Sequence, residues 1–261
     1  MKITVLLENT RCSESLLCEH GLSLYIETGE KRILFDTGKT DAFARNADTL
    51  GIDLDGVDFC ILSHGHYDHG GGLGCFLRRN GHAPVYLRRE ALGGQYNAAG
   101  KYIGLDPALA DSGRLVFSED VLEIAPGITL FGPQPTELPI SSDGLTRLEN
   151  GIQVPEVFPH EQYLLLEEDG KRVLLSGCSH RGIVNIAMSF QSDVLIGGFH
   201  FMNWDPEGKD RQNLAYAAET LLSLPTVYYT GHCTGQAQFN FLKERMGPRL
   251  HAITTGTVLH F

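Results

Sequence analysis

The sequence predicts an α/β protein, and three observations lead to that class. Short segments rich in apolar and β-branched residues, separated by turn residues, open the chain. An almost uninterrupted apolar run at residues 57–63 is typical of a strand that is covered on both faces of its sheet. From residue 163 onward, segments that suit strands alternate with segments of helical periodicity.

The first part of the chain is predicted to be mainly strands, with one helix that follows a run of glycines. Strands are expected at residues 3–8, 22–27, 32–36, 57–63 and 83–90, and a helix at about 73–79. Residues 91–113 mix Gly, Asn, Pro and Tyr and are expected to form an irregular excursion, either a lid or a surface insertion. A second irregular stretch, 133–159, is also expected to border a pocket.

The second part of the chain repeats the style of the first. A hairpin is expected across "DGK", and the remaining segments alternate between helix and strand. The expected strands are 163–168, 172–176, 193–198, 226–230 and 250–261, and the expected helices are 182–190, 211–224 and 235–246. No linker or shift in composition divides the chain. We therefore expect one domain, residues 1–261, built of two similar halves.

Composition and charge narrow the classes of partner. The 21 Lys and Arg against 32 Asp and Glu give a net charge of −11, so a nucleic-acid backbone is not an expected partner. No apolar run reaches the roughly 18 residues of a membrane span, and Glu8 and Arg11 stand where a signal peptide needs apolar residues. The six cysteines lack close CxxC spacing, so a disulfide framework is not expected. These features predict a cytoplasmic protein with a small-molecule substrate, and a homo-oligomer stays an open alternative.

The segment "SHGHYDH" carries the strongest chemical signal in the chain. It places His64, His66, Asp68 and His69 within six residues, directly after an apolar strand and before three glycines. In an extended loop, residues two apart point the same way, so His64 and His66 can face one metal ion. Asp68 and His69, just past the bend, can face a second ion. Imidazole and carboxylate groups are ligands that zinc accepts.

Further candidate ligands lie in the second half of the chain, each at the edge of an apolar strand. These are His160, Cys178, His180, His200, His232 and Cys233. Any one of them alone would more often be an ordinary surface or core residue. Several at equivalent strand edges favour a shared site. His20, in the turn "EHGLS", is a weaker candidate for the border of the same pocket.

The motifs "EHGLS", "ILFDTG", "LSHGHYDHGGGL", "PHEQ", "GCSHRGIVN", "IGGFH" and "HCTG" together resemble the metallo-β-lactamase superfamily. The resemblance covers the whole chain. It is strongest to a branch of metal-dependent hydrolases that includes archaeal dihydropterin–ribofuranosylaminobenzene phosphate synthases. It implies an αββα four-layer sandwich with a metal site at one edge, between the sheets.

The resemblance also implies roles for individual residues. By position, the ligands of a first metal ion would be His64, His66 and His160, and those of a second would be Asp68, His69 and His232. Cys178 stands where many relatives carry a bridging aspartate, but His180, two residues later, could serve in its place. Asp36 matches a residue that steadies the histidine loop. Asp68 would orient the attacking water, and His180 and His200 would face the substrate as proton donors.

These observations predict a metal-dependent hydrolase with a dinuclear site that acts on a small molecule, phosphorylated substrates included. Zinc is the expected metal, with manganese or iron as alternatives. The namesakes of the branch suggest a transferase that joins a dihydropterin diphosphate to an aminobenzene ribofuranosyl phosphate. A non-catalytic metal-bound sensor is the third hypothesis. Nuclease activity is disfavoured by the acidic charge and the lack of a basic arm.

Overall fold

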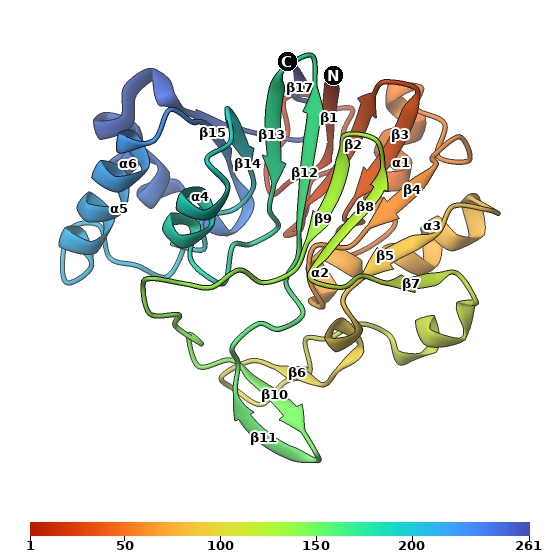
Figure 1. Cartoon of the computed structure of the whole chain (residues 1–261), viewed down its shortest axis with the longest axis horizontal. Helices are drawn as coiled ribbons and strands as arrows, with labels where there is room; N and C mark the ends of the chain where they lie inside the picture. The colour runs from red at the N-terminus through yellow and green to blue at the C-terminus, as the bar shows by residue number, and fades with distance from the viewer.

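The computed structural model describes all residues, 1–261, and contains two seven-stranded sheets that pack face to face (Figure 1). The first sheet has the order β17-β1-β2-β3-β4-β5-β7. Its strands are β1 (Lys2–Leu7), β2 (Ser23–Thr28), β3 (Lys31–Phe35), β4 (Phe59–Ile61), β5 (Val85–Leu87), β7 (Leu115–Phe117) and β17 (Val258–His260). Strands β3, β4, β5 and β7 run parallel to one another, and the other neighbours are antiparallel.

The second sheet has the order β16-β15-β14-β13-β12-β9-β8. Its strands are β8 (Val121–Ala125), β9 (Ile128–Phe131), β12 (Tyr163–Glu168), β13 (Lys171–Leu175), β14 (Val194–Ile196), β15 (Val227–Thr230) and β16 (Leu250–Ala252). Strands β13 to β16 are parallel, as β3, β4, β5 and β7 are in the first sheet. A parallel arrangement requires a crossover connection, which explains why helices follow these strands in the sequence.

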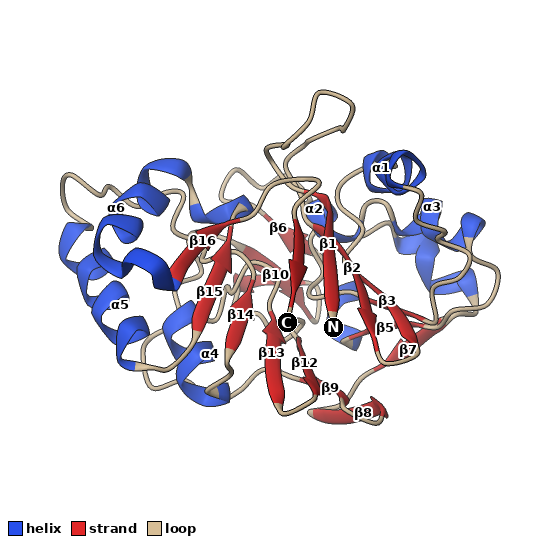
Figure 2. Cartoon of the chain, turned by 90° about the horizontal axis from the view of Figure 1, so that it is seen from above, coloured by secondary structure: helices blue, strands red, loops and turns tan.

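Helices cover the outer face of each sheet (Figure 2). On the first sheet these are α1 (Ala42–Leu50), α2 (Tyr67–Gly70) and α3 (Leu73–Arg79), and on the second α4 (Ile183–Phe190), α5 (Arg211–Ser223) and α6 (Gln236–Met246). Short 3₁₀ segments complete the helices at Arg89–Leu92, Pro107–Ser112, His232–Thr234 and Gly247–Arg249. None of the helices combines the length and the apolarity that a membrane span requires.

Successive side chains along a strand pack into two different apolar cores, one on each face of the sheet, and this alternation creates the layers. Along β12, Leu164 and Leu166 face the core between the sheets, whereas Leu165 faces the core beneath the helices. In β2, Ile26 faces the core between the sheets and Tyr25 faces the helices. Side chains of a strand point alternately to its two faces, so a strand with both faces buried reads as continuously apolar. The result is the predicted αββα four-layer sandwich.

Three features differ from the sequence-based expectations. The strand predicted at 250–261 is wrong as a single element, because the chain leaves the second sheet after β16 and enters the first as β17, turning at Gly256 with a positive φ of 93°. Helix α1 and strands β7, β8 and β9 were not predicted. The two irregular stretches contain strands that pair with each other: β6 (Gln95–Tyr96) joins the hairpin of β10 (Thr146–Glu149) and β11 (Ile152–Pro155) in a small sheet that projects at the bottom of Figure 1.

Candidate metal centre

The candidate ligands follow strands whose carboxyl ends meet at one edge of the two sheets. The segment 63–69 follows β4, and Cys178 and His180 follow β13. His200 lies beyond the end of β14 and His232 beyond the end of β15. Because β13, β14 and β15 are parallel neighbours, their carboxyl ends bring these residues together without any sequence proximity.

Asp36 ties together the two ends of the histidine loop. Its Oδ1 accepts a hydrogen bond from the Ser63 backbone N–H at 2.7 Å, and its Oδ2 accepts one from the Ser63 hydroxyl at 2.7 Å. His69 Nδ1 lies 2.7 Å from the same Oδ2. Asp36 is fully buried and has a left-handed φ of 60°. The carboxylate thereby fixes the His69 ring so that Nε2 faces the centre.

His64 and His66 present buried nitrogen atoms that have no partner. Their ring centroids lie 4.6 Å apart, and Nε2 of each ring makes no hydrogen bond. Burial, reinforced by neighbouring histidines, lowers the pKa of His64 well below its usual range and lowers the pKa of His66 to about 3. Both rings are therefore neutral, which is the form that binds a metal. Buried polar atoms without partners are rare in proteins, so these nitrogens fit a metal-binding role.

The first group of donor atoms consists of Asp68, His69, Cys178 and His232, whose ligand atoms all lie within 4.8 Å of one another. His69 Nε2 is 3.1 Å from the Cys178 sulfur and 3.0 Å from His232 Nε2. Asp68 Oδ2 lies 3.3 Å from His232 Nε2 and, on its other side, 3.3 Å from His20 Nε2. Burial alone would raise the pKa of Asp68, but the contacts with His20 and His232 hold it well below its usual range.

A second group shares one member with the first. The ligand atoms of His64, Cys178 and His180 also lie within 4.8 Å of one another. Both ring nitrogens of His180 are buried without a partner, and the ring stacks on Phe158 at 4.4 Å with an interplanar angle of 9°. His66 lies beside His180 with ring centroids 4.8 Å apart. The Cys178 sulfur is therefore common to both groups, and this imidazole, carboxylate and thiolate set fits transition-metal ions.

His160 lies next to these rings but is held differently. Its Nδ1 accepts a hydrogen bond from the Gly65 backbone N–H at 3.0 Å. Nε2 is 3.5 Å from Oε2 of the buried Glu156. The ring is 5.3 Å from His66, yet it belongs to neither donor group. His66 likewise belongs to neither group, and the structure places His160 beside His64 and His66, with ring centroids 6.0 and 5.3 Å away. Nε2 of His160 is buried without a hydrogen-bond partner, as are those of His64 and His66.

His200 lies at the margin of the centre. Its ring is 4.1 Å from that of His180, and its Nε2 is 3.4 Å from Oδ2 of Asp143. Burial would lower the pKa of His200, but Asp143 and Cys233 outweigh burial and raise it to about 10. The ring of His200 also lies near the sulfurs of Cys178 and Cys233, with donor atoms within 4.8 Å of one another.

The family of the chain follows from a sequence comparison. The family model of the metallo-β-lactamase superfamily matches residues 17–232, which include every member of the first and second donor groups. This chain belongs to the metallo-β-lactamase superfamily. Members of this superfamily generally bind divalent metal ions, in keeping with the buried, unpartnered histidine nitrogens of this centre.

Individual relatives within the metallo-β-lactamase superfamily match over almost the whole chain. The 7,8-dihydropterin-6-methyl-4-(β-D-ribofuranosyl)-aminobenzene-5′-phosphate synthase of Methanocaldococcus jannaschii is 30% identical, covering 93% of this chain and 90% of the synthase. An uncharacterized protein of the same organism is 29% identical over 89% of this chain and 90% of its own length. The crystal structure of Tm1679, a metal-dependent hydrolase of the β-lactamase superfamily, has a TM-score of 0.85 and 30% identity, covering 100% of this chain and 99% of Tm1679.

Several residues at this metallo-β-lactamase centre were missed by the sequence reasoning. Asn9 Oδ1 lies 3.0 Å from His232 Nδ1, and Glu161 accepts hydrogen bonds from the backbone N–H groups of His180 and Arg181 at 2.7 and 3.0 Å. Asn9 lies in none of the motifs quoted above, and Glu161 lies in "PHEQ" but was given no role there. Only the tertiary fold places these two side chains at the centre. Asp143 lies in the stretch 133–159, which was expected to border a pocket. That expectation was the only feature of the sequence that pointed to Asp143.

Glu8 is a further missed residue, and it offers a test of how the His232 loop is held. Its buried carboxylate accepts the His232 backbone N–H at 2.7 Å through Oε1 and the Thr10 N–H at 2.6 Å through Oε2. In Glu8→Gln one oxygen becomes an NH₂ group that faces another donor. We expect unfolding to require about 1–3 kcal/mol less free energy and metal binding at His232 to weaken, measured by denaturant titration and metal analysis.

Glu27→Gln is the matched control, because Glu27 is 40% exposed and pairs only with Lys2 at 2.7 Å. Surface changes of this kind usually shift stability by no more than about 0.5 kcal/mol. Equal stability and equal metal content in the two variants would show that the Glu8 contact does not hold the loop.

Proposed function

We propose that this protein is a metal-dependent hydrolase of small molecules with a dinuclear centre. The ligands of one ion would be His64, His66 and His180, and those of the other Asp68, His69 and His232, with Cys178 shared between them. The observation that carries the proposal is the shared sulfur of Cys178 between two buried donor groups, together with unpartnered Nε2 atoms on His64 and His66.

In this assignment His180 takes the place expected for His160. His180 has two unpartnered ring nitrogens and lies in a donor group with His64. A metal-binding Nε2 of His160 would require Nδ1 to carry the proton, but Nδ1 accepts from the Gly65 N–H in this structure. We therefore propose that His160 supports the histidine loop through Gly65 and does not ligate.

The chain's own residues define what the centre can do. Two divalent ions bound here would lower the pKa of a bound water and would stabilise the negative charge that develops on the substrate. Zinc suits the combination of imidazole, thiolate and carboxylate better than manganese does. Asp68 stays ionised between His20 and His232 and can orient an attacking water and accept its proton.

His200 is placed to complete the reaction on the other side of the substrate. Its ring lies beside that of His180, and both residues line a pocket of about 420 Å³. Asp143 faces its Nε2 and holds the imidazolium form. A leaving group that enters the pocket can therefore take a proton from His200. Asp143 would act as a positioning residue for that ring.

A transferase related to the dihydropterin synthase is the second candidate. The observation that favours it is the 30% identity to that synthase over 93% of this chain. A synthase of this kind would release pyrophosphate only when the arylamine acceptor is present. Hydrolysis would proceed without any acceptor.

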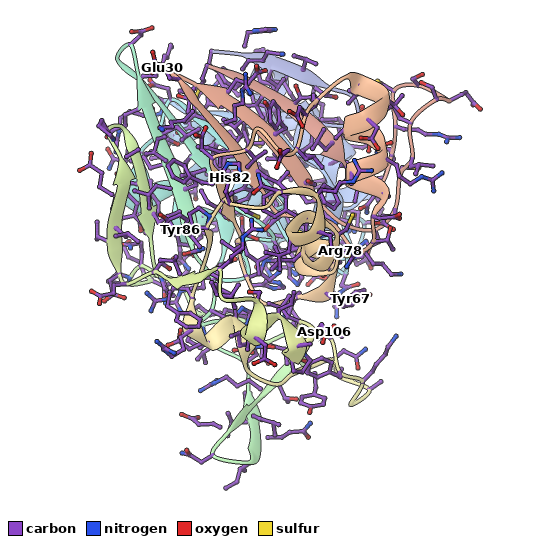
Figure 3. All side chains as sticks on the ribbon, turned by 90° about the vertical axis from the view of Figure 1, so that its right-hand side faces the viewer. Glu30, Tyr67, Arg78, His82, Tyr86 and Asp106 are labelled. Atoms are coloured by element: carbon purple, nitrogen blue, oxygen red, sulfur yellow. The ribbon has the colours of Figure 1, made fainter.

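The experiment compares metal-loaded protein with His64→Ala on ester, lactone and phosphodiester substrates and in the two-substrate transferase assay. We expect about two transition-metal equivalents per chain and turnover without an acceptor, both lost in His64→Ala. His82→Ala is the control, because His82 is exposed on the face shown in Figure 3, outside both donor groups. Metal-free wild-type protein with an intact fold would contradict the proposal, as would metal-replete protein that is silent on every substrate.

A further inference from the structure

The pocket beside His180 and His200 has mainly apolar and aromatic walls. One wall is the segment that follows β9, which passes beneath α4 in Figure 1, and the other walls come from α4, α5 and the loop after β14. Prominent lining residues are Leu138, Ile140, Ile183, Phe201, Trp204 and Tyr216. A volume of about 420 Å³ lies within the range of small-molecule sites.

Three polar side chains of the lining, those of Asn185, Ser179 and Ser141, already have partners within the protein. Asn185 exchanges hydrogen bonds with both the N–H and the carbonyl of Leu138, at 2.9 and 3.1 Å. The Ser179 hydroxyl lies 2.8 Å from that of Ser176. The Ser141 hydroxyl donates to Asp143 at 2.7 Å. A ligand would therefore gain little by hydrogen bonding to these three side chains, and away from His180 and His200 its affinity would come mainly from apolar contact.

The charges of the lining are matched. Neither Lys nor Arg lines the pocket, and its one carboxylate, Asp143, faces His200 at 3.4 Å. Arg181 is adjacent in sequence, but its guanidinium donates to the carbonyls of Val157 and Gln134 at 2.8 and 2.9 Å. An anionic group placed among these walls would lose its hydration, and His200, the side chain that could attract it, already faces Asp143.

We propose that this pocket binds an uncharged aromatic portion of the substrate. Phe201 and Trp204 form a tilted pair with centroids 4.6 Å apart, and Tyr216, 52% exposed, stands at the mouth. Flat rings gain both buried area and favourable ring contacts against such walls. The inference rests on the proposed function, because the bound group would lie beside His200 and the metal centre. It assigns the substrate specificity of that site to Trp204 and Tyr216.

The test uses Trp204, which is the only tryptophan of the chain, as a reporter. The full-length, metal-loaded protein is titrated with benzamide and with two anions, benzenesulfonate and 4-carbamoylbenzenesulfonate, while Trp204 fluorescence is followed. Sulfonates are used because they are weak ligands for transition-metal ions. We expect benzamide to change the emission with an affinity at least about tenfold tighter than the two anions, a difference of about 1.4 kcal/mol. The change should vanish in Trp204→Phe.

Tyr216→Ala should weaken benzamide binding by about threefold or more, whereas Tyr102→Ala, which also removes an exposed tyrosine but lies outside the lining, should not. Equal affinity for the anions, no effect of benzamide on Trp204, or equal affinity in the two tyrosine variants would overturn the proposal. Binding is read without turnover, so benzamide binding by a protein without hydrolase activity would retain the pocket and reject the proposed function. Turnover without benzamide binding would retain the proposed function and reject the pocket.

Discussion

Replacing Cys178 with alanine is expected to remove metal from both donor groups and to reduce turnover by well over about 100-fold. The loss should exceed the roughly 10–100-fold effect of removing a residue that only supports a ligand. The reason is that the Cys178 sulfur lies 3.1 Å from His69 Nε2 and also belongs to the group of His64 and His180. Metal content per chain and turnover of the identified substrate are the two measurements.

Two further variants make this result specific. Cys178→Asp keeps an anionic ligand at the same place and should retain part of the metal, because carboxylates also bind zinc. Cys75→Ala removes a partly buried cysteine of α3 that lies outside the donor groups, and it should behave as wild type. Full metal content in Cys178→Ala would show that the sulfur is not a ligand and that the two groups are not joined through it.

The neighbourhood of the site could be predicted from the sequence because of a general property of parallel strands. Cys178, His200 and His232 each follow an apolar strand, and parallel neighbours place such positions at one edge of a sheet. His64 and His66 were predicted from local spacing alone, since residues two apart in an extended loop face the same side. Neither inference requires knowledge of side-chain contacts.

The orientation of individual side chains could not be predicted in this way. The position of the His160 proton depends on the Gly65 N–H, a contact across 95 residues, and Asp143 reaches His200 only because its loop lies over α4. The pairing of β6 with β10 has the same origin, because each segment is too short to show a period of its own. Such contacts are set by tertiary packing rather than by local pattern.

A comparison of His180→Ala with His160→Asn is expected to distinguish a metal ligand from a residue that only supports the histidine loop. His180→Ala should lose about one metal equivalent per chain and most of the turnover, because its two unpartnered nitrogens lie in the group with His64 and Cys178. His160→Asn should keep its metal content and its turnover, since the asparagine carbonyl can still accept the Gly65 N–H that His160 Nδ1 accepts at 3.0 Å. Metal analysis and steady-state kinetics on both variants provide the measurements.

The opposite result has a defined physical meaning. If His160→Asn loses metal while His180→Ala keeps it, the His160 ring must exchange its proton to Nδ1 when metal binds, and the Gly65 N–H must find another acceptor. Glu156, whose Oε2 lies 3.5 Å from His160 Nε2, would then face an unprotonated nitrogen. Oε1 of Glu156 accepts the backbone N–H groups of Val157 and Phe158, but Oε2 would then be a buried carboxylate oxygen that faces no donor. Such an oxygen is costly, so Glu156→Gln should tighten metal binding in that case and leave it unchanged in the other. This variant therefore distinguishes the two ligand sets independently of activity.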